Sequence, residues 1–221
     1  LVSIVTVGLF VVVLMGTIGR PTYASNAFIT TWKTDNAGTL SGSNQITIPT
    51  NSGTYTYNYD VDWGDGQSDT GVTGDIVHTY SVPGTYTVQI TGTFPAIYFN
   101  KNGDAGKILS IDQWGTNQWV TMQSAFAGCF NLDIIASDIP DLSIATSMSY
   151  IYAGASSLTQ GLASWDVSHI TLMTCALCDA TIFNGDISNW NTSNVTSMAN
   201  MFLNANQFNN NISNWDTSSV L

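Results

Sequence analysis

The stretches SWDVSHITLM (164–173), NWNTSNVTSM (189–198) and NWDTSSVL (214–221) are three copies of one short sequence. Their tryptophans recur every 25 residues. A fixed period of this length is typical of repeat proteins, in which each unit is too small to hold its own core and buries its apolar side chains on its neighbours. The C-terminal half is therefore predicted to be a solenoid with coils of about 25 residues.

Apolar residues recur at fixed places in each copy, and these columns extend the repeat back to about residue 111. A methionine column is followed four residues later by an aromatic or aliphatic one, which is the spacing of one helical face. Ser and Thr before the methionine are suited to cap such a helix. Each coil is predicted to have a short strand around Ile-Ser-x-Trp, a polar turn, and one or two helical turns ending at a small residue. The columns are Met122, Met148, Met173 and Met198; Phe126, Tyr152, Leu177 and Phe202; and Cys129, Ala155, Ala180 and Ala205.

The polar residues of the chain carry little charge. Fifteen Asp stand against three Lys, one Arg and no Glu, which gives a net charge of −11. Long surface helices draw on Glu, Lys and Arg, so their scarcity predicts strands, turns and very short helices. An acidic chain with few cations also disfavours nucleic acid and anionic membranes as partners.

Residues 1–24 are predicted to be a secretory signal peptide. The run 1–18 is apolar and uncharged, and Thr22-Tyr23-Ala24 ends in a small residue suited to cleavage, with Ala27 as a second candidate. No starting Met or basic region precedes the run, so the chain is expected to be truncated at this end. An uncleaved membrane anchor is the alternative, because the run just reaches the shortest length that spans a bilayer. In both cases the rest of the chain is expected outside the cytoplasm, and no membrane insertion of the mature chain is predicted.

Residues 25–100 follow a different pattern, in which apolar and polar residues alternate between turns rich in Gly, Asn, Asp and Pro. Such alternation is typical of half-buried strands, and strands at this spacing predict a small antiparallel β-sandwich. The predicted strands are 28–32, 45–48, 55–63, 76–80 and 85–90.

Two segments resemble known families. VDWGDG (61–66) followed by VHTYSVPGTYTVQITG (77–92) resembles the signature of immunoglobulin-like domains of the polycystic-kidney-disease (PKD) type. The segment 183–198 resembles the repeat of the BspA-like leucine-rich-repeat surface proteins of bacteria. FITTWKTDN (28–36) and ILSIDQWG (108–115) are similar to the module that precedes such repeats.

These resemblances imply a multi-domain protein. They divide the chain into a signal peptide (1–24), an all-β, PKD-like immunoglobulin-like sandwich (25–100) and an α/β leucine-rich-repeat-like solenoid (101–221). The chain stops within a coil and has no polar capping unit, so the solenoid is expected to be truncated at the C-terminus.

Cysteine and histidine suggest chemistry that their surroundings do not favour. Cys175 and Cys178 have the CxxC spacing of a redox pair or half a zinc site, but no second pair or His cluster completes a metal site. Cys178 and Cys129 share columns with alanines and are expected to be small buried residues, whereas Cys175 is expected to be more exposed. The sequence leaves open whether Cys175 and Cys178 form a disulfide. His78 is expected to be packed and hydrogen-bonded, and His169 to lie in a surface turn, so neither is assigned to catalysis.

Carboxylates offer the best candidates for a metal. Asp60, Asp62, Asp65 and Asp69 are close in sequence, and oxygen-rich turns can hold calcium at millimolar affinity. Solvated or turn-forming carboxylates are the favoured interpretation, because Asp65 can bind the amides of its own turn. Stacked carboxylates in the column after the tryptophans would repel each other unless backbone amides or calcium satisfied them, and the Asn in this column argues against a dedicated ion ladder. The column is Asp141, Asp166, Asn191 and Asp216.

The tryptophan column could stack on sugars or anchor a partner, but a Trp beside Ile and Val columns is better explained as core. No catalytic, cofactor-binding or metal-binding residue is therefore assigned, no cofactor is predicted, and calcium stays possible. The predicted function is adhesion to an extracellular protein or glycan by a secreted or cell-surface protein that is not an enzyme. The alternatives are a carbohydrate-binding accessory region of an extracellular hydrolase and a structural surface stalk. The oligomeric state is left open.

Overall fold

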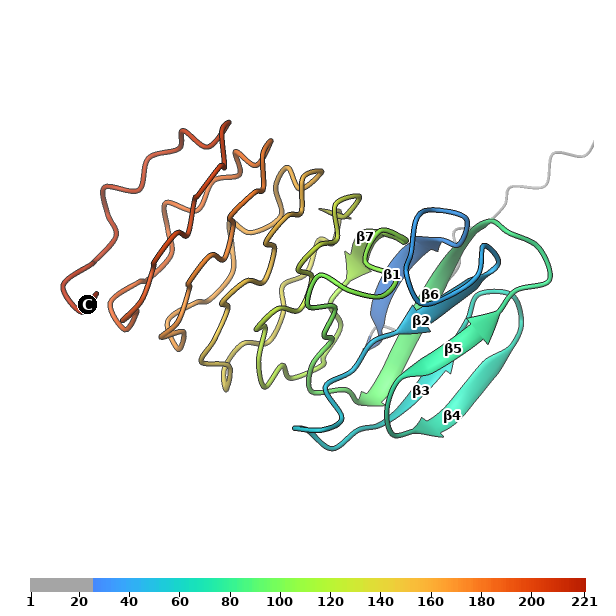
Figure 1. Cartoon of the computed structure of the whole chain (residues 1–221). Helices are drawn as coiled ribbons and strands as arrows, with labels where there is room; N and C mark the ends of the chain where they lie inside the picture. The colour runs from blue at the N-terminus through green and yellow to red at the C-terminus, as the bar shows by residue number, and fades with distance from the viewer. Residues whose placement is uncertain (1–25) are drawn as a thin grey trace, which may run out of the picture.

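The computed structural model describes residues 26–221, and the predicted signal peptide lies outside the described residues. Strands gather at one end of an elongated molecule, and a series of loops runs from them to the C-terminus at the other end (Figure 1). No helix among the described residues has the length and hydropathy to cross a membrane. The strands are β1 (Phe28–Lys33), β2 (Gln45–Ile48), β3 (Asn58–Asp62), β4 (Ser68–Val72), β5 (Ile76–Thr79), β6 (Thr85–Thr93), β7 (Ile108–Gln113) and β8 (Asp133–Ile134).

The strands form a mixed six-stranded sheet and a separate two-stranded sheet. The larger sheet has the order β4-β3-β6-β1-β7-β8, and β2 pairs with β5. All pairs are antiparallel except β7 with β8, which is parallel. The predicted boundary at residue 100 stays a prediction, and the larger sheet continues past it through β7 and β8.

One hydrophobic core runs from the sheets into the loops. Ile46 of β2 and Val88 of β6 belong to the same buried cluster as the methionine column of the repeats. Aromatic rings join the two parts, because Phe28 of β1 packs edge-on against Trp119, with 5.0 Å between the ring centroids, and stacks on Trp114 at 5.7 Å. The repeats are therefore supported by the sheet at one end.

A buried ion pair fastens the segment between β1 and β2 to the turn before β7. Lys107 and Asp104 are each 1% exposed, and Nζ lies 3.7 Å from Oδ1. The ammonium donates to the carbonyls of Gly42 at 2.7 Å and Gln45 at 2.9 Å. Asp104 Oδ2 accepts the amide of Thr47 at 2.7 Å. The ammonium and Asp104 Oδ2 are thus hydrogen-bonded inside the protein, whereas Asp104 Oδ1 accepts no hydrogen bond from the described residues and faces the ammonium at 3.7 Å.

The loops from 116 to 221, here called the repeat array, stack through backbone hydrogen bonds between equivalent residues. In one loop the amides of alternate residues donate to carbonyls 24 residues later. These bonds are Met148 N to Leu172 O, Tyr150 N to Thr174 O, Tyr152 N to Ala176 O and Gly154 N to Cys178 O, with distances from 2.8 to 3.0 Å. Apart from the two-residue strand β8, this pattern orders the array without strands, and the other parallel bridges between its loops, such as Ser147 with Leu172, are isolated.

The predicted fold class is wrong, because the described residues contain no helix and the array is not an α/β leucine-rich-repeat-like solenoid. The expected strand around Ile187 to Trp190 is also missing. Left-handed backbone angles interrupt the expected helix in each loop, with φ of 61° at Tyr150 and 78° at Gly154. Such residues end a right-handed helix, so the chain makes successive tight turns and its amides turn to the next loop. The sheet end also differs from the predicted PKD-type sandwich in its one parallel pair and its continuation past residue 100.

Candidate binding surface

The surface of the repeat array is made largely of Asp, Asn, Ser and Thr whose side chains bind backbone of the array itself. The oxygen Oδ1 of Asp166 accepts the Ser168 amide at 3.0 Å, and Asp216 does the same with the Ser218 amide at 2.9 Å. Hydrogen bonds from the side chain and amide of Ser168 hold the pKa of Asp166 below its usual range. Backbone amides therefore satisfy these two carboxylates, which is one of the two possibilities that the sequence left for this column.

Side chains also link one loop to the next. The Asn194 amide group donates to the Ser168 carbonyl at 2.7 Å, and the equivalent Ser219 hydroxyl donates to Ser193 O at 2.9 Å. On another side of the loops, Asn204 donates to Asp179 Oδ1 at 2.8 Å. Because these groups are held in place before any ligand arrives, the array offers a pre-ordered surface of low charge.

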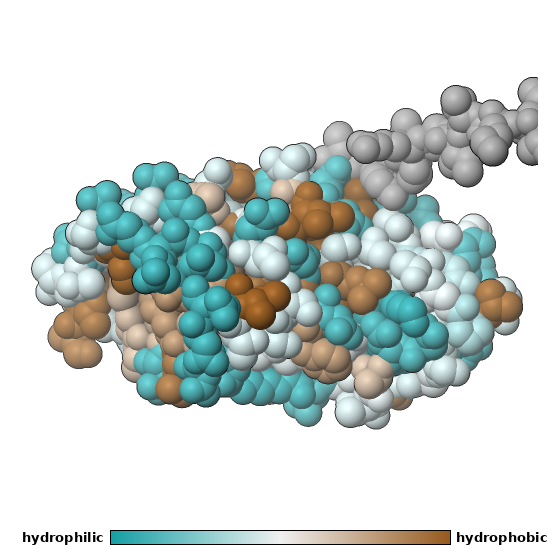
Figure 2. Space-filling view, turned by 90° about the horizontal axis from the view of Figure 1, so that it is seen from above, coloured by the Kyte–Doolittle hydropathy of each residue, from teal (hydrophilic) through white to brown (hydrophobic). Residues whose placement is uncertain are grey.

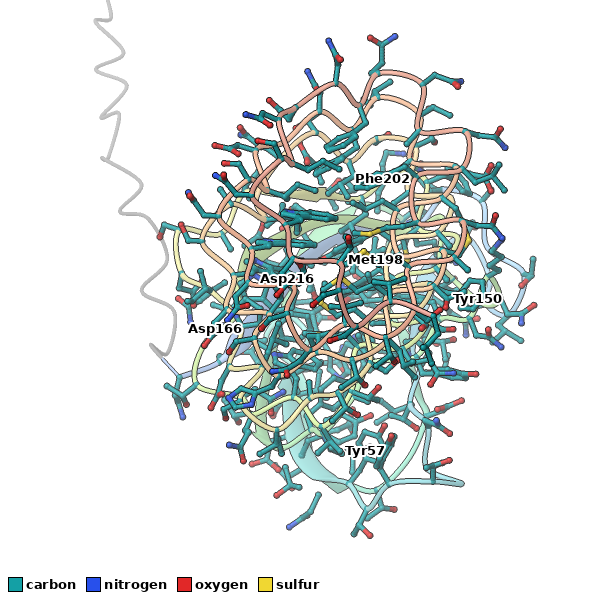
Figure 3. All side chains as sticks on the ribbon, turned by 90° about the vertical axis from the view of Figure 1, so that its left-hand side faces the viewer. Tyr57, Tyr150, Asp166, Met198, Phe202 and Asp216 are labelled. Carbon is teal, nitrogen blue, oxygen red and sulfur yellow. A yellow bond between two sulfur atoms is a disulfide. The ribbon has the colours of Figure 1, made fainter. Side chains whose placement is uncertain are left out.

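The tryptophan column lies inside, as predicted. Trp165 and Trp190 are 4% and 3% exposed, and Trp190 Nε1 donates to Leu162 O at 2.9 Å. Trp215 stacks on Trp190, with their ring centroids 6.0 Å apart. In the view down the array from its C-terminal end, Met198 and Phe202 lie toward the middle, while Asp166 and Tyr150 lie toward opposite margins (Figure 3). The apolar columns are therefore core, and polar residues surround them.

The acidic residues near the Gly-Asp-Gly turn are each used by the local structure. Asp65 accepts the Gln67 amide at 3.0 Å and lies 3.0 Å from His78 Nε2. Slight burial raises the pKa of Asp65, but the hydrogen bonds from His78 and Gln67 outweigh it, so the pKa lies below its usual range. Asp69 accepts Trp63 Nε1 at 2.8 Å.

Asp60 and Asp62 bind backbone amides in the same way, at Gly71 and Gly64 respectively, with distances of 2.8 and 2.9 Å. Among residues 26–221 no three His, Cys, Asp or Glu side chains are grouped as a metal site would need. His78 is buried and stacks on Trp63, with 4.6 Å between the ring centroids, so its predicted packed and hydrogen-bonded state is confirmed.

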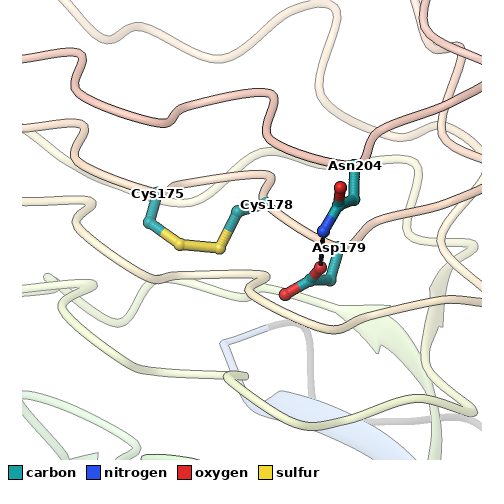
Figure 4. Close-up of a disulfide and its surroundings, with 4 residues drawn as sticks. All are labelled: Cys175, Cys178, Asp179 and Asn204. Carbon is teal, nitrogen blue, oxygen red and sulfur yellow. Dashed lines mark hydrogen bonds between the residues drawn. A yellow bond between two sulfur atoms is a disulfide. The ribbon is translucent and has the colours of Figure 1, made fainter.

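Cys175 and Cys178 form a disulfide, the possibility that the spacing left open (Figure 4). Cys175 is only 9% exposed, so its expected exposure is wrong. The bond spans a tight turn, and the two residues pack in a small cluster with Ala127 and Ala153 of the preceding loops. Cys129 is free and buried, and burial raises the pKa of its thiol well above the usual value. Neither feature resembles a reactive thiolate.

Exposed apolar side chains are scattered over a mainly polar or neutral face (Figure 2). A groove that the sequence analysis missed lies beside the start of the array, with a volume of about 320 Å³. Its lining comes from the segment before β7 and from two loops, and consists of Tyr98, Asn100, Lys101, Gln123, Ser124, Ala127 and Tyr150. No motif marks these residues, and the one available signal was a lysine in a chain that has only three.

Comparison with known proteins found one similarity. Residues 120–221 match the model of a family described as Mycoplasma protein of unknown function, DUF285. No curated protein and no solved structure showed a significant similarity to the chain. The comparisons support neither the PKD resemblance nor leucine-rich repeats. The match nevertheless fits a BspA-like surface protein over the C-terminal half and suggests a surface-associated protein of unknown function.

Proposed function

We propose that this chain is a secreted or cell-surface recognition protein that adheres to an extracellular protein or glycan through its repeat array. The observation that carries the proposal is the coincidence of the family match, at 120–221, with the loops that repeat one surface pattern. Binding, and not catalysis, is the proposed activity, because the exposed carboxylates of this surface are used to build turns.

The shape of the array supports this proposal. Each loop adds polar residues of similar kind at equivalent positions, and bonds such as those of Asn194 and Ser219 to neighbouring loops fix the rows. A partner would therefore meet a long ordered surface whose rigidity lowers the entropic cost of binding. The low density of positive charge argues for partners other than nucleic acid.

The proposal is tested with the full chain on a panel of immobilised glycans and extracellular-matrix proteins, with and without millimolar calcium. Selective binding to a protein or glycan is expected. Binding restricted to polysaccharides would favour the hydrolase-accessory alternative, and absence of binding under both conditions would contradict the proposal in favour of a structural stalk.

Matched substitutions then locate the surface. Ile144, Leu172, Ile182 and Leu203 are between 41% and 51% exposed on the array, and Val82 is 60% exposed in the sheet region. Each is replaced singly by Lys, which leaves the core untouched. At least one change in the array should weaken binding, whereas Val82→Lys should not; the reverse pattern would assign binding to the sheets.

A further inference from the structure

Lys101 is the one lysine among the described residues that has no partner for its charge. Lys33 pairs with Asp35 at 2.7 Å, and Lys107 is buried beside Asp104. Lys101 is exposed and has no ion pair. The chain has a net charge of −11, so an unpaired ammonium is rare on its surface and is available to bind an anion.

The backbone at Lys101 is held in a conformation that few residue types adopt readily. Asn100 and Lys101 have φ of 49° and 63°, which is the left-handed region that costs energy for side chains other than Gly. Their amides donate to Ser124 O at 3.1 Å and Ala127 O at 2.9 Å. Gly128 permits this close approach, because a Cβ atom there would lie 2.8 Å from Lys101 Cα. Strain fixed by its surroundings is frequent at binding sites.

The groove beside Lys101 combines aromatic and amide groups with this single charge. Tyr150 is 40% exposed and lies at the margin of the array, away from Asp166 (Figure 3). A second hollow of about 260 Å³ shares Lys101 and is lined by Phe130, which is 42% exposed. No carboxylate lines either hollow. The local chemistry is therefore that of a neutral surface with one cation.

We propose that this groove binds a glycan that carries a carboxylate, such as a uronic or sialic acid unit. The tyrosine rings suit the C–H faces of a sugar ring, the side chains of Asn100 and Gln123 suit its hydroxyl groups, and Lys101 suits its carboxylate. An acidic peptide or nucleic acid carries many charges, which the net charge of −11 would repel, whereas an acidic sugar asks for one cation on a neutral surface. This inference rests on the proposed function and specifies its ligand class.

The test measures binding by calorimetry with the full chain at low salt. The probes are 3′-sialyllactose with lactose as its neutral partner, and galacturonic acid with its methyl ester. Both acids should bind, and their neutral partners should bind about tenfold or more weakly, as expected for the loss of a charged hydrogen bond. Added salt should reduce the difference.

Three variants and one control variant locate the site. Lys101→Gln should lower the affinity for both acids about tenfold or more, and Lys101→Arg should retain it. Lys33→Gln serves as the control, because it removes an exposed lysine on β1. Tyr150→Asn should also weaken binding without harming the fold, because the array has Asn200 at the equivalent left-handed position.

The outcomes separate this inference from the proposed function. Equal binding of acid and neutral partner, or unchanged affinity in Lys101→Gln, would overturn the inference and leave a recognition role in place. If the two acids do not bind while other glycans or proteins of the panel do, the inference is also overturned and the recognition role stays in place. Absence of binding to every glycan and protein would contradict both.

Discussion

Replacing Lys107 by Met should lower the free energy of unfolding by about 3–5 kcal/mol, because the change leaves a buried carboxylate without its countercharge. Lys107 and Asp104 are each 1% exposed. Methionine has nearly the volume of the lysine stem, so the loss would come from polar groups and not from a cavity.

The magnitude follows from the contacts that are lost. The ammonium donates to three carbonyls, those of Ser41, Gly42 and Gln45, and to the Ser41 hydroxyl at 2.8 Å. Each carbonyl left without a donor adds a desolvation cost of about 1 kcal/mol or more. Even if water reaches some of these groups, the loss should stay near the lower end of the range for a broken buried pair.

Urea unfolding followed by tryptophan fluorescence measures this loss. Lys33→Met is the matched control, because Lys33 forms an exposed pair with Asp35, and exposed pairs are worth about 1 kcal/mol or less. The double variant Asp104→Asn/Lys107→Met should be more stable than Lys107→Met alone, because it removes the uncompensated charge. A loss in Lys107→Met no larger than that of the control would refute the reasoning.

Three further outcomes are expected. In denaturant without reductant, alkylation should modify only the thiol of Cys129, and three modified cysteines would argue against the disulfide. Because hydrogen bonds lower the pKa of Asp166 and Asp216, the stability that these two carboxylates contribute should be fully present above about pH 5 and fall as the pH drops through 3.8 toward the lowered values. The double replacement of these two by Asn should flatten a plot of melting temperature against pH, and an unchanged slope would contradict this. Trp190→Phe should lower the free energy of unfolding by about 1–2 kcal/mol, because the Nε1 hydrogen bond is lost. Trp165→Phe should lower it less, because Trp165 Nε1 has no acceptor among residues 26–221. Urea unfolding should show this order.

The β-strands could be predicted from the sequence where alternation alone decides the structure. The predicted strand 45–48 coincides with β2, and the predicted strand 85–90 lies within β6. Alternating residues report directly which face of a strand is buried, so no distant information is needed. The packed His78 and the buried tryptophans were predictable for a similar reason, since their neighbours in sequence were themselves apolar or strand-forming.

The helices were predicted wrongly because one spacing fits two structures. Met173 and Leu177 are four residues apart and both point into the core, which a helix or two successive tight turns would achieve. A different column of each loop carried the deciding signal, because its residues are of types that accept a left-handed conformation. These residues are Gly128, Gly154, Asp179 and Asn204, and all four adopt that conformation.

The buried ion pair and the groove could not be predicted from local sequence. The acceptors of Lys107 lie more than 60 residues away, at Ser41 to Gln45, so nothing beside Lys107 indicates that it is buried. The groove is likewise lined by Tyr98 and Tyr150, which are distant in sequence and come to the same groove only because successive loops stack. Long-range juxtaposition of this kind becomes visible only in the folded chain.

The same stacking makes recognition at Lys101 independent of the later loops. Lys101 is fixed by the first loop through Ala127 O, and Tyr150 is fixed by the next through Thr174 O. Each loop bonds directly only to its neighbours, so changes near Trp215 should reach the groove weakly, as in other arrays with nearest-neighbour coupling. Trp215→Ala should therefore leave the affinity for 3′-sialyllactose within about twofold. A tenfold loss would show that the array acts as one cooperative unit and that the groove depends on its full length.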